Sequence, residues 1–137
     1  MKELDPEQLK NINTKEREKI RQLIEKIKNK KEDIYGLIIF GSSVDQLNYK
    51  DLDLSIVSDP DISIKTQLEL RVFLPEKYDI HFFHNLPLYV QHEVLKTGII
   101  IYMGNYNKLF DECMKSIKDW ALFEPHFKKY LELIKNY

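Results

Sequence analysis

This 137-residue sequence has a single cysteine, no long apolar run and almost no excess of either charge. Cys113 is the only cysteine, which excludes an intrachain disulfide and fits a reducing compartment. The longest apolar runs, 36–40 and 98–102, are far shorter than the roughly 20 residues that a membrane span needs. Residues 1–19 carry no apolar signal region. We therefore expect a cytoplasmic protein without a membrane segment.

Opposite charges almost cancel, with 21 Lys and Arg against 22 Asp and Glu. A protein whose main task is to coat nucleic acid usually has a clear basic excess, so a nucleic-acid partner is not expected. The length and the apolar fraction are those of one globular domain, and no internal repeat or flexible linker divides the chain. We expect a single domain over residues 1–137.

Helical spacing of apolar residues predicts an N-terminal helix over about 6–30, with Asp5 as its cap, Pro6 in its first turn and a polar interruption at 11–15. The basic run 26–31 at its end is interpreted as a solvated helix terminus. A phosphate- or RNA-facing patch is the sharper alternative.

Short apolar or alternating runs predict strands over 35–40, 52–57, 78–83 and 99–102. Helices are expected over 64–73, 87–96 and 106–136, the last with a break or kink near Pro125. This order indicates an α+β or mixed α/β domain in which helices cover a small sheet. An aromatic stripe on the last helix is either core or a partner surface; it consists of Trp120, Phe123, Phe127 and Tyr130.

Three aspartates on two of the predicted strands form the strongest candidate for chemistry. Asp51 and Asp53 are two residues apart, so their side chains share one face, with Cα atoms roughly 6.5–7 Å apart. Such a pair repels itself unless a cation lies between the carboxylates, and Mg²⁺ is the natural choice. If the strand that carries Asp79 is a neighbour, the three acids can hold two magnesium ions for an in-line displacement at phosphorus.

Gly41 and Ser42 directly follow the first buried strand. Gly41 permits close backbone approach, and Ser42 offers an N–H and a hydroxyl to an anion. A short helix starting just after them would add a favourable dipole at a phosphate group. His81 shares a face with Asp79 and can contact phosphate or orient that carboxylate, although a hydrogen-bonded strand histidine is the preferred interpretation.

The stretch 36–59, GLIIFGSSVDQLNYKDLDLSIVSD, resembles the signature of the nucleotidyltransferases related to DNA polymerase beta: a Gly-Ser, a spacer and an Asp-x-Asp. It is similar in particular to the minimal nucleotidyltransferases, the antitoxins of HEPN/MNT systems. The segment 78–102 is also similar to them, with an Asp-bearing strand, a helix and an apolar strand that ends in Tyr. The resemblance covers about 20–104 and leaves out the first helix and the last thirty residues.

This resemblance implies a polymerase beta-like fold with an added C-terminal helical segment. It implies that Gly41, Ser42 and Ser43 contact the triphosphate of ATP and that Asp51, Asp53 and Asp79 are the catalytic magnesium ligands. It also implies AMP transfer to a hydroxyl, such as a tyrosine of a partner HEPN toxin.

Two departures from the signature bear on activity. The spacer between Ser42 and Asp51 holds eight residues, two fewer than usual, and the Arg and Gly that often follow the Gly-Ser are absent. One alternative is therefore an antitoxin that neutralises its partner by binding, with a weakened nucleotide site. Another is transfer to a small molecule or to RNA. The sequence leaves the acceptor and the oligomeric state open.

Overall fold

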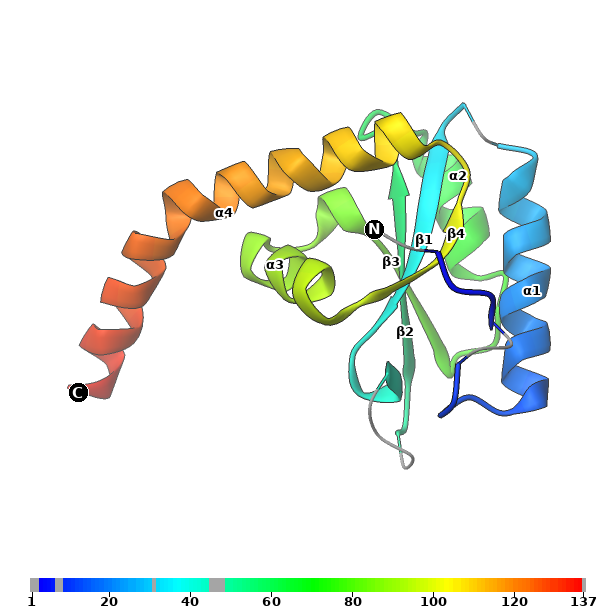
Figure 1. Cartoon of the computed structure of the whole chain (residues 1–137), viewed down its shortest axis with the longest axis horizontal. Coiled ribbons are helices and arrows are strands. Elements are labelled where there is room, and N and C mark those ends of the chain that lie inside the picture. The colour runs from blue at the N-terminus through cyan, green and yellow to red at the C-terminus, as the bar shows by residue number, and fades with distance from the viewer. Residues whose placement is uncertain (1–2, 7–8, 31, 45–48, 137) are drawn as a thin grey trace.

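The computed structural model of the chain describes residues 3–6, 9–30, 32–44 and 49–136. Within these residues, four strands form one sheet in the order β3-β2-β1-β4 (Figure 1). Strand β1 pairs antiparallel with β2 and β4, whereas β2 pairs parallel with β3, so the sheet is mixed. The elements are α1 Thr14–Lys28, β1 Ile34–Phe40, η2 Ser42–Val44, β2 Leu52–Ser58, α2 Ile64–Arg71, β3 Tyr78–Phe82, η3 Phe83–Asn85, α3 Leu88–Thr97, β4 Ile99–Met103 and α4 Tyr106–Lys135.

The burial of the strands follows the sequence patterns that predicted them. Strand β1 is buried along almost its whole length, as its continuous apolar run requires. In β3 the apolar side chains are buried, whereas Asp79 is exposed and His81 is partly exposed. This alternation gives the β3 face that carries Asp79 and His81 access to solvent.

Two hydrophobic clusters lie on opposite faces of the sheet. In Figure 1, α1 and α2 lie on one side of the strands, and α3 with the first half of α4 lies on the other. The cluster beneath α1 and α2 includes the fully buried Ile20, Leu23, Ile27, Leu37, Ile39, Leu52, Leu54, Ile56, Leu70 and Phe82. The smaller cluster beneath α3 and α4 contains Tyr35, Ile38, Val57, Phe83, Val94, Ile100, Leu109 and Cys113.

The first helix begins later than predicted. It starts at Thr14, and its cap is Asn13, whose Oδ1 accepts the Glu16 N–H at 2.8 Å. The predicted start at Asp5 and Pro6 is wrong: the Leu4 N–H pairs with the Ile100 carbonyl of β4 at 2.8 Å, and the hydrogen bond from the Leu9 N–H to the Pro6 carbonyl at 3.2 Å is not continued into α1.

Helix α4 runs without interruption through Pro125. The proline has no N–H to donate to the preceding turn, and Figure 1 shows the outer half of the helix turning away from the direction of the first half. The predicted kink is therefore present, whereas a break is not. Leu109, Cys113 and Ser116 are buried on the inner half.

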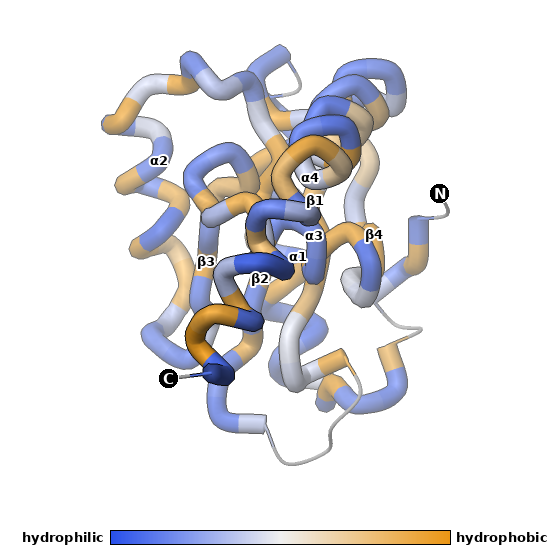
Figure 2. Tube along the Cα trace, turned by 90° about the vertical axis from the view of Figure 1, so that its left-hand side faces the viewer, coloured by the Kyte–Doolittle hydropathy of each residue, from blue (hydrophilic) through white to orange (hydrophobic). Residues whose placement is uncertain are grey.

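The aromatic stripe on the outer half of α4 is only partly covered. Trp120 stacks on His92 at 4.5 Å between ring centroids, and Phe127 stacks on Tyr89 at 5.8 Å, so α3 covers part of the stripe. Phe123 is exposed. Figure 2 shows hydrophobic stretches that continue to the end of α4. Among the described helices, none is both long enough and apolar enough to cross a membrane.

Candidate active site

Asp53 and Asp79 lie side by side across the parallel pair formed by β2 and β3. The register aligns Leu52 with Tyr78 and Asp53 with Asp79. The two carboxylates therefore project from neighbouring strands, whose backbones lie about 4.8 Å apart. At the lower edge of the sheet in Figure 1, β1 ends while β2 and β3 begin. The parallel register therefore produces the acid pair at one end of the sheet.

The structure also brings His81 to these two acids. Its Nε2 lies 3.6 Å from Asp53 Oδ1 and 3.3 Å from Asp79 Oδ2. The neighbouring Asp53 carboxylate, and after it Asp79, raise the pKa of His81, against the opposing effect of burial. The sequence placed His81 on the face of Asp79, and the structure puts its imidazole within 4 Å of both candidate carboxylates. The Phe40 ring lies 5.9 Å from the imidazole.

These side chains fit a divalent cation. One ligand atom each from Asp53, Asp79 and His81 lie within 4.8 Å of one another, and no other three His, Cys, Asp or Glu side chains among the described residues come this close. Carboxylate oxygens suit Mg²⁺, which keeps water and phosphate oxygens as its remaining ligands. The Asp79 side chain is 56% exposed, so a substrate can reach the site from solvent.

Asp51 lies directly before β2 and is exposed. It is not a member of the group formed by Asp53, Asp79 and His81. The structure thus brings together two of the three predicted acids and adds a histidine. The role of Asp51 as a metal ligand stays a prediction.

Gly41 closes the other side of the Asp53 carboxylate. Its φ is +80°, a conformation that favours glycine. A Cβ at this position would lie 2.5 Å from Asp53 Oδ2. The glycine therefore lets the backbone turn against the acid without a clash.

A single 3₁₀ turn, η2, runs from Ser42 to Val44 directly after Gly41. Ser43 is buried and lines a cavity of about 250 Å³ together with Leu9, Ile12 and Ile39. Its hydroxyl is buried and has no hydrogen-bond partner among the described residues, so it does not face a triphosphate from solvent. Residues 45–48 of the shortened spacer lie outside the described residues.

Comparison with known proteins identifies the family of the chain. The family model described as polymerase beta, nucleotidyltransferase matches residues 18–107, which is more than half of the chain. A relative from Methanocaldococcus jannaschii, named "Putative protein adenylyltransferase", is 29% identical over 98 residues, covering 70% of this chain and 77% of the relative.

Solved structures of toxin-antitoxin complexes share the fold. One chain in a structure of the tri-AMPylated Shewanella oneidensis HEPN toxin in complex with MNT antitoxin matches at a TM-score of 0.65 and 13% identity. The match covers 85% of this chain and 96% of that chain. A toxin-antitoxin with AMP-PNP matches at a TM-score of 0.66 and 14% identity, covering 86% and 97%. At these identities the matches establish the fold, which confirms the predicted architecture. The family model, which matches 90 of the 137 residues, shows that the chain belongs to the polymerase beta nucleotidyltransferase family.

Proposed function

We propose that this nucleotidyltransferase transfers AMP from ATP to a hydroxyl group, and that the acceptor is a tyrosine of a partner HEPN toxin. The observation that carries the proposal is the alignment of Asp53 with Asp79 beside Gly41. The name of the archaeal relative supports a protein acceptor, and the AMPylated toxin in a structure of the same fold supports the HEPN class.

Asp53 and Asp79 would hold magnesium together with Asp51, which precedes β2 by one residue. The bound metal would neutralise charge on the triphosphate and on the oxygens that gain charge during transfer. His81 contacts both carboxylates and would orient them. Gly41, Ser42 and the backbone of Ser43 would contact the phosphates where β1 ends.

In the reaction, the acceptor oxygen forms a bond to the α-phosphorus, and the bond from that phosphorus to the bridging oxygen of pyrophosphate breaks. Pyrophosphate leaves with that electron pair, and the acceptor proton passes to Asp79 or to solvent. Asp79 is suited to this role because its side chain is 56% exposed beside the cation site. Catalysis would come from positioning and electrostatics, without a covalent enzyme intermediate.

A small domain of this kind fits an acceptor that brings its own surface, which favours a folded protein over a small molecule or an RNA end. The reaction would take place in the cytoplasm, where ATP and magnesium are available.

Label transfer tests the proposal. Purified protein, Mg²⁺ and ATP labelled at the α-phosphate would be mixed with a candidate HEPN partner, and the labelled product identified by mass. We expect Asp53→Asn and Asp79→Asn to lower the rate by about 100-fold or more. The matched control Asp111→Asn changes an exposed aspartate on α4 and should retain activity. Full labelling by both site variants would reject the assigned residues.

Neutralisation by contact is a second candidate, and the exposed apolar side chains on the outer half of α4 favour it. Tyr130 is 60% exposed and Leu133 is 68% exposed, and apolar surface of this kind often marks protein contacts. If the partner is silenced equally by the wild type and by Asp53→Asn, with a stable complex and no label, contact is the mechanism.

A further inference from the structure

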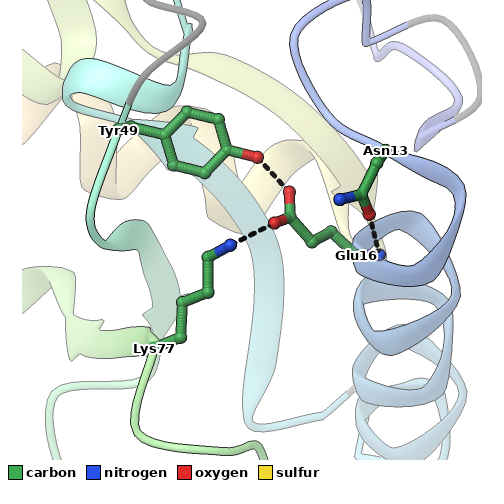
Figure 3. Close-up of polar contacts among 4 residues, drawn as sticks. All are labelled: Asn13, Glu16, Tyr49 and Lys77. Carbon is green, nitrogen blue, oxygen red and sulfur yellow. Dashed lines mark hydrogen bonds and ion pairs between the residues drawn. The ribbon is translucent and has the colours of Figure 1, made fainter.

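A buried glutamate lies behind the active site, at the start of α1. Glu16 is 4% exposed, and its two carboxylate oxygens accept hydrogen bonds from the Tyr49 hydroxyl and the Lys77 ammonium (Figure 3). The Lys77 ammonium also lies 5.3 Å from the centroid of the Tyr49 ring. Three segments that are far apart in the sequence therefore meet at one carboxylate.

The position of Glu16 in its helix shows that this arrangement is not ordinary capping. Asn13 caps α1 and accepts the Glu16 N–H, and a glutamate three residues after the cap commonly turns back to the cap backbone in a capping box. In Figure 3 the Glu16 carboxylate points away from Asn13, toward Tyr49 and Lys77. Its two oxygens are committed to these long-range partners.

The two partners stand at the starts of the strands that carry the acids. Tyr49 precedes Asp51 by two residues and β2 by three, and Lys77 precedes Asp79 by two. The Lys77 carbonyl also accepts the Leu52 N–H at 3.0 Å, next to the Asp53–Asp79 pair. Glu16 thus ties together the two segments whose parallel register places the carboxylates side by side.

A carboxylate in this position costs desolvation, and its two donors offset that cost. If Glu16 loses its charge, the Lys77 ammonium loses its buried counter-ion and one donor loses its acceptor. The starts of β2 and β3 would then be held only by the backbone ladder and the core. We propose that Glu16 is a positioning residue, which fixes the spacing of Asp53 and Asp79 through Tyr49 and Lys77. This inference rests on the proposed function, because it assigns the two acids to one metal site.

The test is Mn²⁺ binding to the full chain, measured by isothermal titration well below the unfolding temperature. Partners bonded directly to metal ligands are worth 10- to 100-fold in affinity; Glu16 acts one step further out, through Tyr49 and Lys77, so Glu16→Gln should raise the Mn²⁺ dissociation constant by about threefold to tenfold. The matched control is Glu18→Gln, an exposed glutamate on the same helix, which should bind as the wild type does. A purely structural role would lower thermal stability and leave the Mn²⁺ affinity of the folded protein unchanged.

Tyr49→Phe provides a milder variant in case Glu16→Gln does not fold, because it removes one hydroxyl and keeps the ring. It should weaken Mn²⁺ binding in the same direction. If both variants fold, the double variant should weaken binding less than the product of the two single effects, since the side chains act as a unit.

The outcomes separate this inference from the proposed function. If Asp53→Asn abolishes Mn²⁺ binding while Glu16→Gln and Tyr49→Phe bind as the wild type does, Glu16 is not a positioning residue and the metal site stands. If the wild type binds no Mn²⁺, the metal site of the proposed function fails, and whether Glu16 fixes the starts of β2 and β3 is then decided by amide hydrogen exchange. Faster exchange at Leu52, with unchanged exchange in β4, supports it, and unchanged exchange at Leu52 overturns it.

Discussion

Replacing Gly41 with alanine perturbs the site at its closest backbone approach. The backbone there has φ of +80°, and an L-residue with a side chain costs roughly 1–2 kcal/mol in the left-handed region. The new Cβ would lie 2.5 Å from Asp53 Oδ2, about 0.9 Å short of the 3.4 Å at which ordinary contact begins. Either the turn or the carboxylate must therefore move.

We expect Gly41→Ala to lower the free energy of unfolding by about 1–2 kcal/mol and to lower the transfer rate much more. A misplacement of about 1 Å in a catalytic group can cost about 100-fold in rate. Urea denaturation measures the first quantity, and single-turnover label transfer to the partner measures the second. The rate should be compared at saturating ATP, so that weaker binding does not mimic slower chemistry.

Gly104→Ala is the matched control. Its Cβ would also meet a close neighbour, but that neighbour is the Tyr102 hydroxyl at 2.6 Å, and Gly104 joins β4 to α4 rather than closing the site. This variant should keep the wild-type transfer rate even if it is somewhat less stable. A Gly41→Ala protein with wild-type transfer activity would refute the close packing of Gly41 against Asp53 as a requirement of the site.

Three further predictions concern stability, reactivity and the last helix. Burial would raise the pKa of Glu16, but the hydrogen bonds from Lys77 and Tyr49 outweigh it and lower that pKa below 4.5. The stabilising contribution of Glu16 is therefore present above pH 4.5 and is lost as the pH falls through the lowered pKa. When stability is measured by urea denaturation at decreasing pH, Glu16→Gln should lose less stability than the wild type does. Burial raises the pKa of Cys113 to about 11, so a thiol reagent at pH 8 should modify it only after unfolding, and rapid reaction of the native protein would contradict this. Pro125→Ala restores a helical N–H and should slow amide hydrogen exchange over 126–135, whereas unchanged exchange would show that the proline does not weaken α4.

Local patterns were sufficient to predict the sheet and most of its helices. Each strand coincides with an apolar or alternating run. In β3, the alternation correctly placed Asp79 on the face opposite to the buried apolar side chains. The start of α1 was predicted wrongly because the pairing of Leu4 with Ile100 joins residues almost a hundred positions apart. No spacing rule for helix caps contains such a contact.

Some residues of the candidate site could likewise be predicted from local patterns, whereas others required the tertiary structure. Gly41 and Asp53 follow from a short motif, and their mutual contact depends only on where β1 ends and β2 begins. His81 was found on the correct face, but its approach to both carboxylates depends on the parallel register of β2 and β3. The partners of Glu16 lie 33 and 61 residues away, so its role required the tertiary structure.

The central claim is that the acid pair at the end of the sheet transfers a nucleotidyl group. The most direct measurement follows two reactions with the same partner protein, one with ATP labelled at the α-phosphate and one with ATP labelled at the γ-phosphate. We predict that the α-label becomes attached to the partner and that the γ-label is released in pyrophosphate, both only with a divalent metal and an intact Asp53. Attachment of the γ-label, or of neither label, would contradict it.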